Sequence, residues 1–185
     1  MTGPASGSAP PSGIVRATRV WALVGVVLLL GRSALVLALR GFEGLDEAVL
    51  GAVEWLGLFA IVGLFVWGEG VRALARRWCP RVLARAADLG AHTPWFWRIV
   101  APLRVVGLVG VPRGIWVRSW TAVAAIVVAA LSVRQLPDPW RSMVELGVGL
   151  ALAVGVVRLG VGLPAVVSPD GRRSPSRTLD NRGAE

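Results

Sequence analysis

The sequence predicts an all-α, polytopic membrane protein with four transmembrane helices and amphipathic or interfacial helices in a cytoplasmic middle loop. Three observations lead there. Hydrophobic residues make up 55% of the 185 residues, and the mean hydropathy is +0.64. The apolar residues form long runs instead of short interrupted ones. The arginines gather mainly between these runs, so the net charge of +9 fits basic cytoplasmic loops better than a nucleic-acid partner.

Four apolar runs are candidate spans, at about 20–39, 48–67, 119–134 and 142–161. Each is close to the roughly 20 residues that cross a hydrocarbon core, and backbone in lipid must satisfy its own hydrogen bonds as helix. The first run has no A-x-A cleavage site after it, so we expect a retained helix. We therefore predict a transmembrane domain over 16–167 between disordered segments at 1–15 and 168–185.

The arginines also predict an orientation. The loop expected at 70–118 carries nine arginines, whereas the segment before the second span carries Glu43, Asp46 and Glu47. The positive-inside rule then places this loop and both termini in the cytoplasm. Every basic side chain is arginine, and Ala, Val, Gly and Leu are abundant, as in proteins of GC-rich bacteria. The expected location is the bacterial cytoplasmic (inner) membrane.

Two stretches of the middle loop have helical character. Residues 80–90 place Val82, Leu83, Ala86 and Leu89 on one face, with Arg81, Arg85 and Asp88 facing away. Residues 95–111 are apolar enough to raise a fifth or re-entrant span as an alternative, but Arg98, Arg104 and Pro102 oppose it. We expect a helix in the membrane interface. The loop should bind anionic lipid headgroups through Arg76, Arg77, Arg81, Arg98, Arg104, Trp95 and Trp97.

Two charges fall inside predicted spans. Arg32 lies about 12 Å from the expected outer end of the first span, and Glu54 about 10 Å from that of the second. We expect these spans to be antiparallel neighbours, because a short loop joins them. Arg32 and Glu54 are then predicted to form an intramembrane charge pair, either a structural device that sets helix register or part of a transport pathway.

Small residues recur at a spacing of four in the last two spans. Gly147, Ala151 and Gly155 form one stripe, and Thr121, Ala125 and Ala129 form the other. Such stripes allow close helix approach in membranes. They are predicted either to face each other or to form a homo-oligomer interface; another membrane protein is a further expected class of partner.

Residues 69–157 carry a resemblance. The segments "EGVRALARRWCPR", "RQLPDPWR" and "GVGLALAVGV" resemble those of a group of small bacterial integral membrane proteins of uncharacterised function. The resemblance implies a membrane protein with a basic loop, and it implies no activity and no site residues.

No catalytic motif is evident. His92 and Cys79 are the only histidine and cysteine, so one chain cannot supply a zinc site from them. There is no H-x-x-x-H and no phosphate-binding glycine loop. We therefore predict no enzyme activity, no cofactor and no metal. The function predicted is that of a non-catalytic accessory or envelope-associated membrane protein; the alternative is an oligomeric small transporter or channel subunit that uses Arg32 and Glu54.

Overall fold

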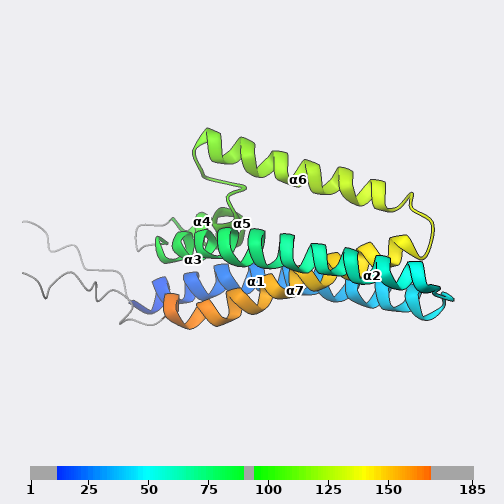
Figure 1. Ribbon diagram of the computed structural model, residues 1–185. Coiled ribbons are helices and arrows are strands. Elements are labelled where there is room, and N and C mark those ends of the chain that lie inside the picture. The colour runs from blue at the N-terminus through cyan, green and yellow to red at the C-terminus, as the bar shows by residue number, and fades with distance from the viewer. Residues whose placement is uncertain (1–11, 90–93, 168–185) are drawn as a thin grey trace, which may run out of the picture.

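The computed structural model describes residues 12–89 and 94–167, and this part of the chain is helical without strands (Figure 1). The predicted disordered segments mostly lie outside the described residues, but residues 12–15 belong to the first helix. The elements are α1 (Ser12–Asp46), α2 (Ala52–Leu64), η1 (Phe65–Trp78), α3 (Cys79–Ala87), α4 (Trp95–Ile99), α5 (Ala101–Val106), α6 (Arg113–Val133) and α7 (Trp140–Val167).

Four helices are long and apolar enough to cross a membrane. They are Gly13–Asp46, Ala52–Ala87, Arg113–Val133 and Trp140–Val167. The all-α class and the four candidate spans are thus confirmed at the level of length and composition. The first and last helices run past the predicted bounds at both ends, the second only at its end and the third only at its start. With a rise of about 1.5 Å per residue, α1 is about 50 Å long, well beyond a hydrocarbon core of about 30 Å.

The second candidate span is one continuous helical rod of α2, η1 and α3. The middle loop expected from residue 70 therefore begins as helix and leaves it only after Ala87. Pro80 does not interrupt the rod, because it stands in the first turn of α3. η1 is a π-helix, and the Cys79 N–H donates to the Leu74 carbonyl five residues earlier. Hydrophobic periodicity carries no signal for that geometry.

α7 is the central helix of the molecule. It packs along α1 for much of its length and also contacts η1, α2 and α3. The first two spans, predicted to be neighbours, make only limited contact: α1 contacts the second span at α3, and α1 and α2 do not pack along each other. The short connection brings one end of each helix together, and α7 then takes the extended contacts with both.

Glycines explain why α7 fits so closely against α1. A Cβ atom added at Gly149 would lie 2.7 Å from the Ala38 nitrogen and 3.0 Å from the Ala34 oxygen. At the other end of the contact, a Cβ at Gly41 would lie 2.6 Å from the Leu146 nitrogen. Backbone meets backbone here, as expected for small-residue helix contacts in membranes.

The predicted small-residue stripe of α7 faces η1 and its junction with α2. Ala151 is 3% exposed, and a Cβ at Gly70 would lie 3.1 Å from the Ala151 Cα. Gly147 meets the Phe65 side chain, and Gly155 meets Leu74. The stripe therefore packs against η1 of the same chain, and not against either predicted partner, α6 or a second copy of the chain.

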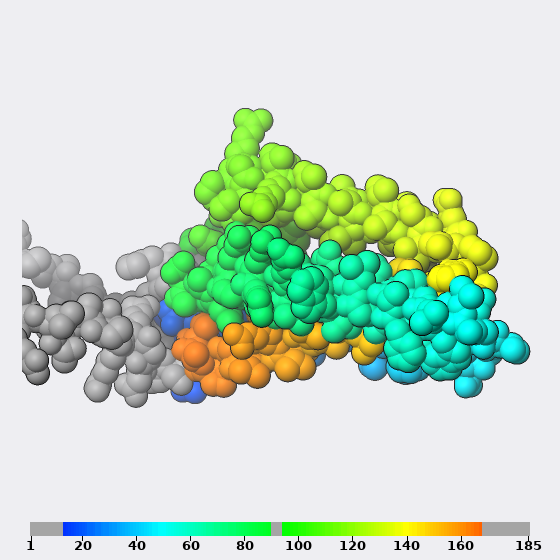
Figure 2. All heavy atoms as spheres, viewed as in Figure 1, coloured from blue at the N-terminus to red at the C-terminus, as the bar shows by residue number. Residues whose placement is uncertain are grey.

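α6 stands apart from the other helices. None of its residues is buried, and it makes no extended contact with another described element. Figure 1 shows it running beside the bundle, and Figure 2 shows the hollow that separates it from the body of the molecule. Its own small residues, Thr121, Ala125 and Ala129, are exposed.

The 95–111 stretch forms two short helices instead of a span. α4 has five residues and α5 has six, and they meet at Val100, just before Pro102. α5 ends at Gly107 with φ +91°, where the Leu108 N–H donates to the Leu103 carbonyl at 2.9 Å. This left-handed position favours glycine because it has no Cβ. Neither helix is long enough to cross a bilayer, so the structure contains no fifth span in this stretch.

Candidate functional site

The molecule has two chemically different ends. We call residues 12–26, 70–118 and 155–167, as far as they are described, the basic end. We call residues 40–55 and 134–145 the acidic end. Figure 1 shows α3, α4 and α5 at the same end as the start of α1 and the close of α7. The loops α1–α2 and α6–α7 lie together at the opposite end.

A packed core holds the basic end together. It joins α1, α3, α5 and α7 through Ala22, Leu23, Val26, Cys79, Val82, Ala86, Leu89, Ala101, Val105 and Leu159. The apolar face predicted for 80–90 is confirmed, because Val82, Ala86 and Leu89 are buried and Leu83 packs against them. Arg85, predicted to face away, is half-buried and bonds to the Val105 carbonyl. The arginines of this region can therefore be presented from a defined surface.

Side-chain hydrogen bonds fix the short helices to this core. The Arg19 Nε donates to the Leu89 carbonyl at 3.1 Å, and the Trp21 indole donates to the Ile99 carbonyl at 3.3 Å. The Arg85 guanidinium donates to the Val105 carbonyl at 3.3 Å. These bonds connect α1 to α3 and α4, and α3 to α5, across large separations in sequence.

The predicted headgroup-binding residues all lie at the basic end, but they differ in surroundings. Arg76, Arg77 and Arg81 are exposed on η1 and α3, and Trp95 is 73% exposed on α4. Arg98 is half-buried. These side chains share one region of the structure, which the loop prediction required.

Trp97 and Arg104 instead contact each other. The Arg104 guanidinium carbon lies 5.5 Å from the centre of the Trp97 ring, within cation–π range. A Cβ at Gly110, where φ is +67°, would lie 2.9 Å from that ring. Trp97 therefore also packs the α4–α5 segment, a role that the sequence prediction did not include.

Charge is divided between the two ends. The acidic end carries Glu43, Asp46, Glu47, Glu54, Asp138 and Glu145. Among the described residues, the only carboxylates toward the basic end are Glu69 and Asp88. The one ion pair found in the described ranges, Arg141 to Glu145 at 2.9 Å, is also at the acidic end. Most arginines of the basic end thus lack a carboxylate within the described chain to neutralise them.

The structure does not bring Arg32 and Glu54 together. Arg32 is exposed on α1, 14 residues before the helix ends at Asp46, which places it about 21 Å from that end. α2 begins at Ala52, so Glu54 lies in its first turn. The predicted match in depth assumed that the second span begins near Glu47. Because the helix bounds differ, no contact supports the charge pair, and its transport role stays a prediction.

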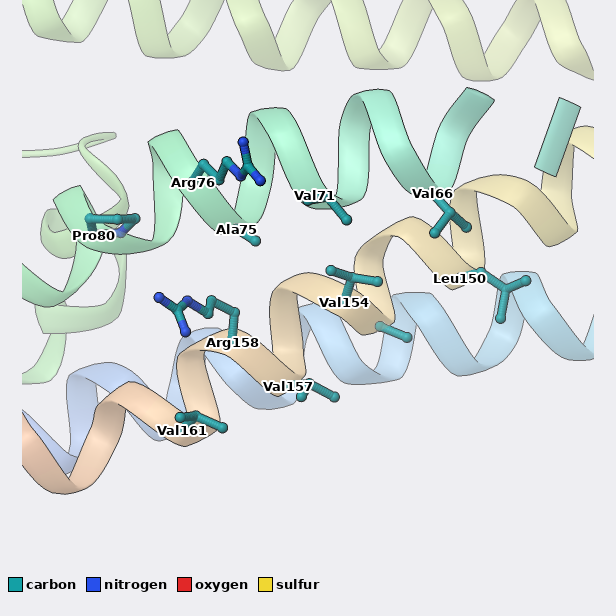
Figure 3. A pocket seen from close by; sticks show the side chains of 11 residues that line it. Val66, Val71, Ala75, Arg76, Pro80, Leu150, Val154, Val157, Arg158 and Val161 are labelled. Carbon is teal, nitrogen blue, oxygen red and sulfur yellow. The ribbon is translucent and has the colours of Figure 1, made fainter. Parts of the chain in front are cut away.

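One groove lies between η1 and α7 (Figure 3). Its volume is about 880 Å³, and most of its lining is apolar. Arg76 on η1 and Arg158 on α7 are the charged residues in that lining. In Figure 3 the Arg158 side chain extends from α7 toward η1, while Val66 and Leu150 line the far part of the groove. Nothing local in the sequence pairs Arg158 with Arg76, which stands 82 positions earlier.

A second groove, of about 930 Å³, lies between α6 and the α2–η1–α3 rod. Ile126 and Val123 of α6 form part of one wall, and Arg81, Arg85 and Arg118 are also in the lining. This groove differs from the first because Glu69 lies within its lining and provides a negative charge from the chain itself.

No group of three or more His, Cys, Asp or Glu side chains is placed to hold a metal ion in the described ranges. Cys79 is buried, and its thiol lies 3.6 Å from the Gly155 carbonyl. It helps to pack η1 and α3 against α7.

No family model, curated protein or solved structure matches this chain. The resemblance to small bacterial membrane proteins stays a prediction.

Proposed function

We propose that this chain is a non-catalytic integral membrane protein of the bacterial cytoplasmic membrane whose basic end binds anionic lipid headgroups. Its role would be that of an accessory or envelope-associated factor. The observation that carries the proposal is the division of charge: arginines outnumber carboxylates at the basic end, whereas at the acidic end six carboxylates stand against Arg40, Arg134 and Arg141. Both described ends of the chain lie at the basic end, so one orientation would place both termini in the cytoplasm.

The lipid part of the proposal follows from electrostatics. The cytoplasmic leaflet attracts basic segments, with a contribution of about 1 kcal/mol for each Lys or Arg near the surface. Exposed tryptophan is favoured at headgroup depth, where its ring is amphipathic. The alternative, a transporter built around Arg32 and Glu54, has no contact between those residues to favour it.

Orientation is tested with introduced cysteines. Cys79 is 0% exposed and would not report accessibility, so it is first changed to alanine. Arg77→Cys and Glu47→Cys then place one thiol at each end, because both native residues are exposed. A membrane-impermeant maleimide should label the Glu47→Cys variant in intact cells and the Arg77→Cys variant only after permeabilisation. The reverse pattern would contradict the proposed orientation.

Lipid preference is tested on the full chain in bilayers. Spin-labelled phosphatidylglycerol and phosphatidylcholine are compared for the fraction immobilised at the protein surface. We expect preferential immobilisation of phosphatidylglycerol that weakens in high salt, because exposed charges are screened. Equal immobilisation of the two lipids in low salt would contradict headgroup binding by the basic end.

A further inference from the structure

We propose that the groove between η1 and α7 binds one anionic phospholipid molecule, with its phosphate at Arg76 and Arg158 and an acyl chain against the apolar walls. The inference rests on the proposed lipid-facing function and makes it specific. It distinguishes a single built binding site from the general attraction of lipids to a basic surface.

The two arginines of the groove favour an anionic ligand. Arg76 and Arg158 come from different helices and line the same groove. In the described chain, the only ion pair joins Arg141 and Glu145 at the opposite end, so neither groove arginine has a carboxylate of the described residues at salt-bridge distance. Two like charges beside an apolar surface are unfavourable without a counter-charge. A phosphate suits them, because a guanidinium can bind its oxygens through two parallel hydrogen bonds.

The apolar walls of the groove favour a ligand with a hydrocarbon chain. Val66 and Val71 of η1 line the groove together with Leu150, Val154 and Val157 of α7 (Figure 3). A volume of about 880 Å³ falls in the range of binding pockets, about 300–1,000 Å³. A free phosphate ion would fill only the arginine end. A phospholipid matches both the charge and the apolar wall.

The depth of the arginines also fits a lipid. Arg158 follows Trp140, the first residue of α7, by 18 residues, or about 27 Å of helix. That is nearly the thickness of a hydrocarbon core, about 30 Å. If α7 spans the membrane from its acidic end, Arg158 reaches the opposite headgroup layer. Leu150 and Val154 then lie at the depth of the acyl chains.

The walls of the groove are held in place without the ligand. A Cβ at Gly70 would lie 3.1 Å from the Ala151 Cα, and the Cys79 thiol lies 3.6 Å from the Gly155 carbonyl. These contacts set the separation of η1 and α7. A preformed groove reduces the ordering cost of binding, so one lipid should remain longer here than elsewhere on the surface.

The groove beside α6 is the weaker candidate for the same lipid. Glu69 is part of its lining and offers a counter-charge to Arg81, Arg85 and Arg118 from within the chain. α6 also makes no extended contact with another described element that would fix the width of that groove.

The experiment is native mass spectrometry of the full chain, released from micelles after equilibration with equal amounts of phosphatidylglycerol and phosphatidylcholine. We expect one phosphatidylglycerol to survive delipidation. The R158Q variant should lower the retained fraction at least about tenfold, since charged hydrogen bonds of about 1.5–3 kcal/mol are lost. R72Q removes the same charge from an exposed position of η1 that lies outside the groove lining and outside the predicted headgroup-binding residues, and it should retain the lipid.

A second pair of variants changes shape without changing charge. V157W places a large ring at a groove position that is 65% exposed in the native chain, so the fold should accept it. It should reduce lipid retention. V127W is the matched control on α6, where Val127 is 52% exposed and lies outside both grooves. Should R158Q fail to fold, as judged by its melting temperature, V157W and R76Q still decide the question.

The outcomes separate the inference from the function on which it rests. Retention of both lipids alike, or retention that neither R158Q nor V157W lowers, would overturn the bound-lipid site. If spin-label measurements still showed preference for phosphatidylglycerol, the proposed function would stand without this site. If that preference were also absent, the proposed function would fail as well. Displacement of the lipid by an acidic peptide that binds the parent and not R158Q would identify a protein occupant and overturn the inference.

Discussion

α6 and α7 look alike in the sequence and behave differently in the structure. Both are apolar and long enough to span a membrane, and both carry small residues four apart. α7 is the helix on which α1, η1, α2 and α3 pack, whereas α6 has no buried residue. The difference shows that a stripe of small residues permits close packing and does not select a partner.

Glycine content explains part of the contrast. The packed faces of α7 include Gly147, Gly149 and Gly155, at which an added Cβ would meet a neighbouring helix. The α6 stripe consists of threonine and alanine, and the one glycine within α6, Gly114, has nothing within 4 Å of its added Cβ. The backbone of α7 approaches the backbones of neighbouring helices closely, whereas the backbone of α6 does not.

The largest effect should come from overpacking the α7 stripe. Ala151→Leu adds a large side chain at a 3%-exposed position against Gly70, and overpacking typically costs about 1–3 kcal/mol. Ala125→Leu makes the same change on the exposed α6 stripe and should leave stability within about 0.5 kcal/mol. Thermal unfolding in detergent, followed by tryptophan fluorescence, measures both. A loss at Ala125 as large as at Ala151 would show that α6 packs on another surface.

A smaller effect should separate two glycines of the same helix. Gly149→Ala would place a methyl group against the α1 backbone, and the two helices would have to separate. Gly160→Ala meets nothing within 4 Å and should gain helix propensity of up to about 1 kcal/mol. We expect the melting temperature to fall for Gly149→Ala and to stay level or rise for Gly160→Ala. Equal shifts would mean that α1 and α7 are not in this close contact.

The sequence predicted what depends on local pattern. Hydropathy located the four spans, because insertion length is a property of one segment. Periodicity identified the buried face of α3, since Val82 and Ala86 recur at helical spacing. Helix ends were predicted less well, because α1 continues past Arg40 as helix, where Gly41 packs on α7. A signal for that contact was present, namely the small residues Ala34, Ala38 and Gly41 at spacings of four and three.

What the sequence left open depends on tertiary contact. Arg76 and Arg158 are 82 positions apart, and only the packing of η1 on α7 brings them to one groove. The headgroup-binding arginines were predicted from composition alone, which carries no information about the residues that surround each of them in the structure. Trp97 shows the consequence, because its ring packs against Gly110 and Arg104 as well as lying at the basic end.

The smallest expected effect concerns Arg32 and Glu54. With the two residues apart, Arg32→Leu and Glu54→Leu should change stability independently. A double-mutant cycle on unfolding in detergent should then give a coupling energy within about 0.5 kcal/mol of zero. The single Arg32→Leu change should be neutral or stabilising, because it removes an exposed charge from a helix flank that is otherwise apolar. A coupling above about 1 kcal/mol would show that the two charges meet in the membrane. In that case α1 and α2 would have to shift by several turns relative to each other, and α7 would lose the contacts at Gly41 and Gly149 that make it the central helix.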